Sequence, residues 1–158
     1  MTKSIAILSG PSLNILGERE PEIYGTTTLP QIEEMCTKKA AEVGAKILFF
    51  RQSNHEGMLI DWIQEARGKA KGIIINAGGY THTSVAILDA LQAVSLPTIE
   101  VHLSNIFRRD EFRQHSYVSL AATGVICGLG PKGYELAIEA MANILSNSKG
   151  RRDVAGRA

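Results

Sequence analysis

The sequence is poor in the residues that mark several large classes of protein. Its 158 residues include only 2 cysteines, 5 prolines and 6% aromatic residues, and 17 Lys and Arg are balanced by 16 Asp and Glu. Cys36 and Cys127 lie far apart and outside any C-x-x-C pair, which argues against a disulfide framework or a thiolate metal site and favours a reducing cytoplasm. A formal net charge of +1 gives no general basic field for nucleic acid or an anionic membrane. No apolar run approaches the length of a membrane span, so we expect a soluble, unprocessed protein.

The sequence does have enough chain and enough apolar residues to bury a core. With 44% hydrophobic and 21% charged residues, its composition is that of a globular protein, and its length corresponds to one domain. We therefore expect a single domain over residues 1–145. We expect residues 146–158, which are rich in Lys and Arg, to form a basic, flexible tail.

Short apolar runs rich in β-branched residues alternate with stretches of helical spacing. Runs this apolar are typical of strands that are covered on both faces. The strand candidates are Ser4–Leu8, Ile47–Phe50, Gly72–Ile75, Thr98–Val101 and Val125–Cys127. The helix candidates are 28–44, with Thr28 as N-cap and Gly44 at its end, then 57–66, 84–93 and 133–145. This order predicts an α/β fold with a parallel sheet, right-handed crossovers and helices on both faces.

The segment after the first strand is a candidate for function, because reactive groups in such sheets gather beyond the carboxyl ends of the strands. It runs from Ser9 to Thr27, and a connection of that length is commonly a lid or a binding loop. It carries Arg19 and Tyr24. A free phenol has a pKa of about 10, so it is a base at neutral pH only where guanidinium groups favour the phenolate. Arg19, with Arg113 as a second source, could supply that charge; the alternative is that Tyr24 is an exposed loop aromatic.

His102 is the candidate general acid. It stands at the end of the fourth strand, two residues after Glu100, so the two side chains point to the same face. A carboxylate beside an imidazole fixes its tautomer and raises its pKa, which suits a general acid. A buried histidine with a satisfied hydrogen bond is the alternative interpretation.

Groups that could bind an anion follow the third and fourth strands. Backbone amides in a turn can receive a carboxylate, and small polar residues form a similar cup. The candidates are Leu103 and Ser104 after the fourth strand, and Asn76, Gly78, Gly79 and His82 after the third. Asp89, on the following helix, has the simpler interpretation of a solvated charge.

Other site types find less support. Gly128, Gly130 and Gly133 spell G-x-G-x-x-G between a strand and a helix, which suggests a nucleotide-binding protein. However, no strand follows with the acidic residue that this fingerprint requires, and Pro131 removes an amide, so a tight strand-to-helix turn is the alternative. The four histidines show no metal-ligand spacing.

Taken together, these segments resemble the type II 3-dehydroquinate dehydratases. The match runs from Ile5 to Leu145, and several long motifs in one order are more specific than any single short motif. The motifs that carry it are Gly17–Gly25, which reads GEREPEIYG, Gln52–Gly57 with Leu59–Asp61, Asn76–Ser84, Glu100–Asn105, Phe112–Tyr117 and Gly124–Gly130.

The resemblance implies a flavodoxin-like three-layer fold with a five-stranded parallel sheet, no cofactor, and a homododecamer built as a tetramer of trimers. It implies a hydro-lyase that catalyses the reversible anti-elimination of water from 3-dehydroquinate to give 3-dehydroshikimate. Such an enzyme serves either aromatic biosynthesis through the shikimate pathway or the breakdown of quinate.

The resemblance also implies a role for each candidate side chain. Tyr24, as a phenolate held by Arg19, takes the proton beside the ketone and gives an enolate, and His102, oriented by Glu100, protonates the departing hydroxyl. The substrate-binding positions implied are Asn76, Gly78, Gly79, Leu103 and Ser104 around the carboxylate, His82 and Arg113 at ring hydroxyls, and Asp89 reaching into a neighbouring subunit's site.

The sequence departs from the family at Ser12. The usual motif after the first strand is N-G-P-N-L-N, and here it reads Ser9-Gly-Pro-Ser-Leu-Asn14. The family's asparagine helps to hold the water that faces the enolate oxygen, and a hydroxyl cannot copy both amide groups. We expect a slowed enzyme; the alternative is a weakened relative that binds a cyclic carboxylate as a sensor or assembly module. Gly79, where the family more often has alanine, should matter less.

Overall fold

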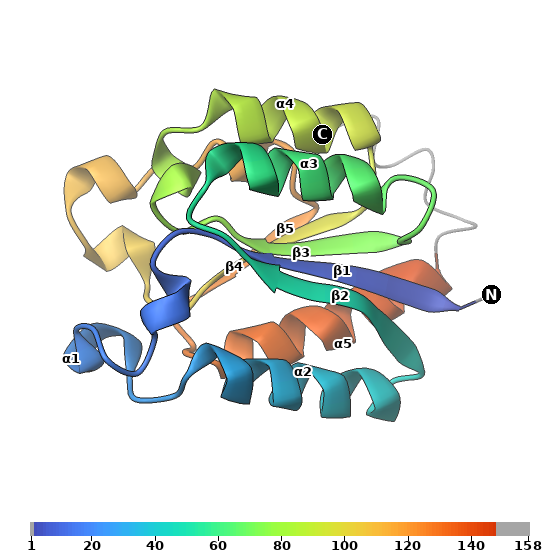
Figure 1. The fold of residues 1–158 in the computed structure, drawn as a ribbon, viewed down its shortest axis with the longest axis horizontal. Helices are drawn as coiled ribbons and strands as arrows, with labels where there is room; N and C mark the ends of the chain where they lie inside the picture. The colour runs from blue at the N-terminus through green and yellow to red at the C-terminus, as the bar shows by residue number, and fades with distance from the viewer. Residues whose placement is uncertain (1, 148–158) are drawn as a thin grey trace.

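The sheet has five parallel strands. The computed structural model describes residues 2–147, and its strand order is β2-β1-β3-β4-β5. The strands are β1 (Lys3–Ser9), β2 (Ala45–Gln52), β3 (Gly72–Asn76), β4 (Thr98–His102) and β5 (Gly124–Cys127). All five predicted runs are therefore strands, and the predicted parallel sheet is confirmed (Figure 1).

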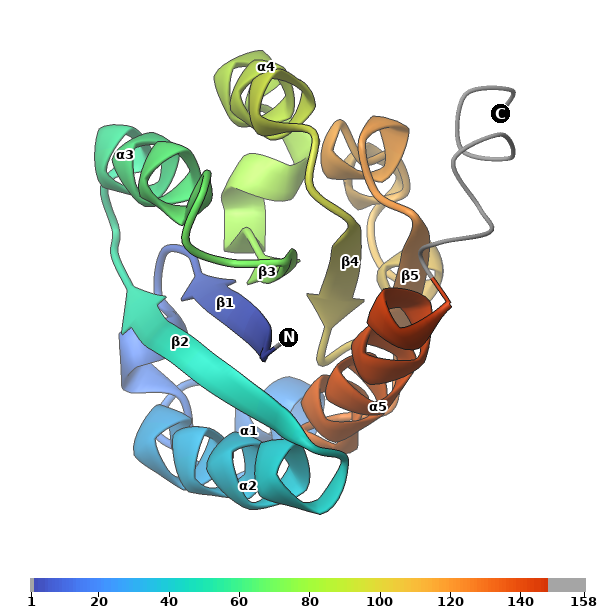
Figure 2. The same ribbon diagram turned by 90° about the vertical axis from the view of Figure 1, so that its right-hand side faces the viewer.

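Helices cover both faces of this sheet. The long ones are α2 (Leu29–Glu42), α3 (Glu56–Ala66), α4 (Val85–Val94) and α5 (Lys132–Ser146), and a short α1 (Pro21–Tyr24) lies in the first connection. Figures 1 and 2 show α2 and α5 on one face and α3 and α4 on the other, which gives three layers. Thr28 caps α2 as predicted, since its side chain accepts from the backbone N–H of Gln31 while the Gln31 side chain accepts from the N–H of Thr28.

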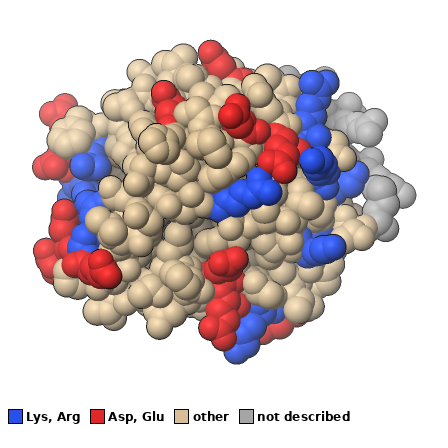
Figure 3. Space-filling model, viewed as in Figure 1, with Lys and Arg blue, Asp and Glu red and all other residues tan. Residues whose placement is uncertain are grey.

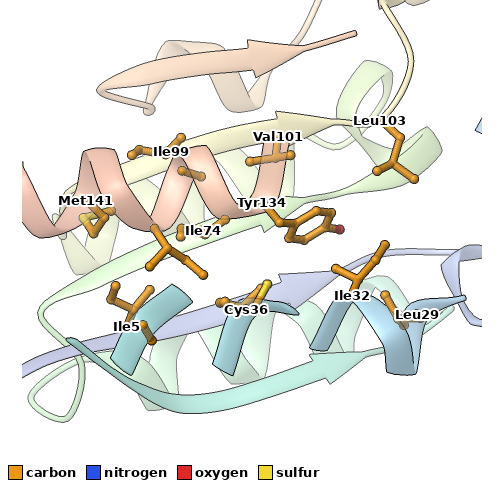
Figure 4. Close-up of a cluster of buried hydrophobic side chains, with 14 of the residues drawn as sticks. Ile5, Leu29, Ile32, Cys36, Ile74, Ile99, Val101, Leu103, Tyr134 and Met141 are labelled. Carbon is orange, nitrogen blue, oxygen red and sulfur yellow. The ribbon is translucent and has the colours of Figure 1, made fainter. Parts of the chain in front are cut away.

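The alternation of side chains along each strand divides the core in two. Ile5 and Ile7 of β1 pack toward α2 and α5, whereas Ala6 and Leu8 pack toward α3 and α4. Figure 4 shows the first of these clusters, in which Tyr134 of α5 lies among the apolar side chains. Both faces are buried, which explains why the strands are continuous apolar runs.

The same alternation sets the direction of the fourth strand. Ile99 and Val101 of β4 belong to the cluster under α5, so Glu100 and His102 point to the opposite face of the sheet. There they meet the connection between β4 and β5, which contains the 3₁₀ turns η3 (Ile106–Arg108), η4 (Glu111–Arg113) and η5 (Val118–Leu120). That connection covers polar groups of β4 that would otherwise face solvent.

The strand order reverses between β1 and β3, and function is expected at such a reversal. The two chain segments leaving these strands approach closely. A Cβ on Gly10 would lie 2.4 Å from the carbonyl oxygen of Ala77, and the N–H of Gly10 donates to the carbonyl of Asn76 at 2.7 Å. Only glycine permits this contact, which brings the first and third loops together at the carboxyl edge of the sheet.

The C-terminal helix ends close to the predicted end of the domain. Helix α5 extends one residue beyond the expected domain end, to Ser146, and residues 148–158 of the expected tail lie outside the described residues. Figure 3 shows acidic and basic side chains mixed over one face of the molecule, in keeping with the near-neutral net charge. Over residues 2–147, no helix has the length and apolar character needed to cross a bilayer.

Candidate active site

A polar pocket of about 280 Å³ opens at the carboxyl ends of β1, β3 and β4. All but two of the predicted site residues line it. They are Ser12, Arg19, Tyr24, Asn76, Gly78, Gly79, His82, His102, Leu103, Ser104 and Arg113. The structure thus gathers into one cavity side chains that are up to about 100 positions apart in the sequence.

The two predicted residues outside the lining are Glu100 and Asp89. Glu100 is fully buried, and it is linked to the pocket lining by its hydrogen bond to His102. Asp89 lies on the exposed side of α4.

The first wall of the pocket is the connection that holds Tyr24. This half-buried ring has the Arg19 guanidinium 4.9 Å from its centre, and a second guanidinium, that of Arg109, at 5.5 Å. The backbone reaches this position through a left-handed turn at Glu20, with φ 38°, followed by Pro21 at the start of α1. The ring is therefore held between cations on a short helical turn.

Arg109 is a pocket residue that the sequence analysis missed, since Arg113 was the expected second cation. Arg113 also lines the pocket, but its guanidinium lies over Phe112. The available signal was the position of Arg109 soon after the fourth strand, at the carboxyl edge of the sheet. That signal could not separate it from the adjacent Arg108, which is exposed.

Ser12 lies at the mouth of the first loop in a left-handed conformation. Its φ is 67°, and its N–H donates to Oδ1 of Asn54 at 2.9 Å. The side chain of Gln52 supports the same loop by donating to the carbonyl of Gly10 at 3.1 Å and to Oδ1 of Asn54 at 3.1 Å. Among non-glycine residues, asparagine adopts this conformation more readily than serine does.

The second wall carries a buried acid–base pair. Nε2 of His102 donates to Oε2 of Glu100 at 2.5 Å, as the same-face spacing on β4 predicted. Burial acts to raise the pKa of the Glu100 carboxyl, but the hydrogen bonds from His102, Ser119 and Ser116 outweigh it, so this pKa lies below its ordinary value. Glu100 is therefore a carboxylate at neutral pH. Because Nε2 of His102 is bonded to this carboxylate, Nδ1 is the ring nitrogen outside the pair.

The polar cup after β3 is anchored from below. Oδ1 of Asn76 accepts from the N–H of Gly78 at 3.2 Å, and Gly78 has a left-handed φ of 58°. Under the cup, the hydroxyl of Tyr134 lies 3.1 Å from Oγ of Ser9. Burial raises the pKa of Tyr134 to about 12, against the opposing effect of hydrogen bonds from Ser9 and Asn76. Tyr134 is thus a neutral phenol that contacts Ser9 at the carboxyl end of β1.

His82 is fixed by a reciprocal pair of hydrogen bonds. Its Nδ1 lies 2.8 Å from the carbonyl oxygen of His115, and Nε2 of His115 lies 2.8 Å from the carbonyl oxygen of His82. Burial is the largest influence on the pKa of His82 and lowers it below its ordinary value, and the charges of His102 and Arg113 act in the same direction. Because a carbonyl only accepts, Nδ1 carries the proton, and Nε2 of the neutral ring is an acceptor.

The charge of the lining has one sign. Arg19, Arg109 and Arg113 line the pocket, and among the lining residues there is no aspartate or glutamate. Nε of Arg113 is buried and has no hydrogen-bond partner within residues 2–147. A cavity with this lining favours a small anionic ligand that also accepts and donates several hydrogen bonds.

The glycine-rich segment after β5 supports this wall rather than standing apart from it. Gly128 and Gly130 have φ of 86° and 63°, and their N–H groups donate to the carbonyls of His102 and Leu103. This is the tight strand-to-helix turn that the sequence allowed as an alternative to a nucleotide loop. Within residues 2–147 no cluster of three or more His, Cys, Asp or Glu could hold a metal ion.

A 2-1-3-4-5 parallel sheet covered on both faces, with a polar pocket at the carboxyl edge, defines the flavodoxin-like class of α/β proteins. Residues 3–142 match the family model for class II dehydroquinase. The chain is 60% identical over 144 residues to a 3-dehydroquinate dehydratase of Phenylobacterium zucineum, covering 91% of this chain and 99% of that protein. It is 57% identical over 145 residues to one of Caulobacter vibrioides, with 92% and 99% covered.

Solved structures agree with these relatives. The crystal structure of type II dehydroquinase from Propionibacterium acnes superposes with a TM-score of 0.86 at 44% identity, covering 90% of this chain and 98% of that one. The chain belongs to the class II dehydroquinase family. The family resemblance inferred from the motifs is therefore confirmed.

Proposed function

We propose that this protein is a 3-dehydroquinate dehydratase that removes water reversibly from 3-dehydroquinate to give 3-dehydroshikimate. One observation carries the proposal: a phenol flanked by two guanidinium groups shares a cation-lined pocket with a buried histidine–carboxylate pair. These are the groups that an elimination beside a ketone needs, namely a base, an acid and an anion-binding surface. The activity named for the relatives of 57–60% identity is the same reaction.

The first step is removal of the proton on the carbon beside the ketone. Tyr24, as the phenolate, takes this proton, and the electron pair moves to the ketone oxygen to give an enolate. The guanidinium groups of Arg19 and Arg109 lie 4.9 and 5.5 Å from the ring centre and place positive charge beside the base. Ser12, on the same loop, lines the pocket, and in this mechanism its hydroxyl positions the water that meets the developing oxyanion.

The second step is loss of the hydroxyl group. The enolate returns its electron pair to form the carbon–carbon double bond, the carbon–oxygen bond breaks, and His102 gives its proton to the departing hydroxyl, which leaves as water. Glu100 holds His102 through Nε2, so Nδ1 is the donor. One proton is gained by Tyr24 and one is lost by His102, and exchange with water restores both.

The remaining lining binds the substrate. Asn76, Gly78, Gly79 and the turn at Leu103 and Ser104 form the cup for its carboxylate, beside the strand ends. His82 offers Nε2 as an acceptor for a ring hydroxyl, and Arg113 offers its unpaired Nε as a donor. The site needs no cofactor for this chemistry, because the base and the acid are both side chains.

We further propose the assembly expected for the family, a dodecamer built from four trimers, in the cytoplasm. The exposed position of Asp89 on α4 supports a role in the pocket of a neighbouring subunit. Sedimentation velocity measures the assembly, and Asp89→Asn should raise KM in an assembled enzyme. A monomeric enzyme with full activity would contradict this part of the proposal.

The test of the reaction is a steady-state assay with 3-dehydroquinate, following the ultraviolet absorbance of the conjugated product. Tyr24→Phe removes only the hydroxyl, and we expect kcat to fall by about 10³-fold. Tyr80→Phe is the matched control, since its hydroxyl donates to the carbonyl of Asn54 outside the pocket lining. Absence of product with the unaltered protein, or an unchanged rate in Tyr24→Phe, would refute the proposal.

A further inference from the structure

The side chain of Glu100 accepts hydrogen bonds from more than His102. It is fully buried, and both of its oxygens are engaged. Oε2 accepts from Nε2 of His102 at 2.5 Å and from Oγ of Ser116 at 2.8 Å, while Oε1 accepts from Oγ of Ser119 at 2.5 Å. The two serines thus supply two of the three donors that replace water around this carboxylate.

The direction of the Ser116 hydroxyl proton is set by a backbone N–H, and the segment that carries both serines is fixed by its packing. Oγ of Ser116 also accepts from the N–H of Ser119 at 3.1 Å, so its own hydrogen is directed to Glu100. Between the serines, Val118 is fully buried in the core under α3 and α4, and the N–H of Tyr117 donates to the carbonyl of Thr81 at 3.0 Å. The backbone of the segment is therefore fixed by the burial of Val118 and by the bond to Thr81, and it presents both hydroxyls to Glu100.

We propose that Ser116 and Ser119 are positioning residues for proton transfer, which keep Glu100 ionised and thereby hold His102 in the orientation and protonation state that a general acid requires. This inference rests on the proposed role of His102. Neither serine lines the pocket, so they act on the reaction only through Glu100.

The two serines affect the position of the proton that His102 and Glu100 share. Burial disfavours a charged carboxylate, and with one donor alone the proton between His102 and Glu100 would be drawn toward the carboxyl oxygen. Donation from two hydroxyls stabilises the carboxylate, so the proton stays on the imidazole. Two other ionisable groups face this pair. The charge of Glu100 acts to raise the pKa of Cys127 on β5, and the charge of His102 acts to lower the pKa of His82. His82 is itself close to the charge of Arg113.

The test compares Ser119→Ala, Ser116→Ala and the double variant with Ser119→Thr, which keeps the hydroxyl. For Ser119→Ala we expect the acidic limb of the kcat profile to move upward by about one pH unit and kcat at neutral pH to fall about tenfold. KM should stay within about twofold, because the pocket lining is intact. Ser119→Thr should restore both the limb and the rate. Ser4→Ala is the matched control, since it removes a hydroxyl bond to the carbonyl of Lys69 at the amino end of β1.

A second readout does not depend on turnover. Infrared difference spectra between two pH values detect the C=O stretch of a protonated buried carboxylic acid, and Glu100→Gln identifies the band from this residue. In Ser119→Ala and in the double variant, the band should appear at higher pH than in the unaltered protein. Coincident titrations in all of these proteins would overturn the inference, as would a loss of rate in Ser119→Ala that Ser119→Thr fails to restore.

Failure of the proposed function is a different result. It would show as no conversion of 3-dehydroquinate by the unaltered protein, or as full activity in His102→Ala. The infrared titration would then still decide whether the serines hold Glu100 ionised. If Ser116→Ala fails to fold, Ser119→Ala carries the test, because Ser119 is an exposed residue.

Discussion

The wall of the pocket that carries Tyr24 and the wall that carries His102 hold their side chains by different means. Between positions 12 and 25 the first wall has four residues with left-handed φ, at Ser12, Gly17, Glu20 and Gly25. The Tyr24 ring lies beside guanidinium groups, and Arg19 pairs with Glu20 in a partly exposed contact at 3.3 Å. This wall is built from backbone turns and charge.

The second wall is built from buried hydrogen bonds. Glu100 lies on β4, where it accepts hydrogen bonds from three protein side chains, and β5 pairs with β4 up to His102. Breaking such a network leaves a buried polar group unpaired, whereas removing an exposed cation does not. The base side of this enzyme should therefore lose activity without losing stability, and the acid side should lose both together.

The largest loss of stability is expected for Glu100→Gln. The glutamine side chain has an NH₂ group in place of one oxygen, so one set of donors around position 100 loses its acceptor. We therefore expect kcat to fall by at least about 100-fold. The free energy of unfolding in urea should fall by about 3 kcal/mol. Glu65→Gln is the control, because its pair with Arg51 lies at the surface and its loss should change the stability far less. Retention of full stability in Glu100→Gln would remove the contrast between the two walls.

Arg109→Met tests the other side of the contrast. We expect kcat to fall about 10- to 100-fold because one of the two charges beside Tyr24 is lost. The unfolding free energy should change by no more than about 0.5 kcal/mol, since the side chain is only half-buried. Arg108→Met, at the exposed neighbouring position, should leave both quantities unchanged. If Arg109→Met matched Arg108→Met in rate, a single cation would suffice at Tyr24.

These two arginines also show how far the sequence could be interpreted. The β-branched runs predicted every strand, and the same-face spacing of Glu100 and His102 predicted their contact. The long-range partners could not be predicted in this way. Which of Arg108 and Arg109 turns inward depends on the 3₁₀ turn η3.

The partners of Glu100 illustrate the same limit. Ser116 and Ser119 are 16 and 19 residues away from it along an irregular connection, and no period in the sequence reports the direction of a hydroxyl. The family resemblance identified eleven of the residues that line the pocket, but not Arg109. The support beneath them, including the contact of Tyr134 with Ser9, emerged only from the packing of α5 on the sheet.

Ser12→Asn should improve the first wall. Asparagine is better suited to the left-handed backbone at φ 67°, and its amide offers a donor and an acceptor together. We expect kcat to rise about tenfold and the unfolding free energy to rise by about 0.5 kcal/mol. Ser95→Asn is a matched control, because Ser95 is also left-handed, with φ 54°, but lies at the end of α4. Ser95→Asn should raise the unfolding free energy and leave kcat unchanged. An equal kcat for Ser12→Asn and the unaltered protein would indicate that the loop is already adapted to serine.

The smallest expected effect is a pH dependence of stability that comes from His82. Its pKa is lowered in the folded protein, chiefly by burial, so the unfolded chain binds a proton at a higher pH than the native state does. The stability from this group is fully present above the unfolded pKa of about 6.5 and is lost as the pH falls from there toward the folded pKa. The lowered pKa of Glu100 acts in a separate window, since its contribution is lost on acidification below the ordinary carboxyl pKa of about 4.3.

The urea midpoint of unfolding should thus decline as the pH is lowered from 8 to 5. His82→Gln should flatten this decline, whereas His55→Gln, at an exposed site, should leave it in place. A slope that persists in His82→Gln would mean that the reciprocal bonds with His115 hold the protonated ring as well as the neutral one.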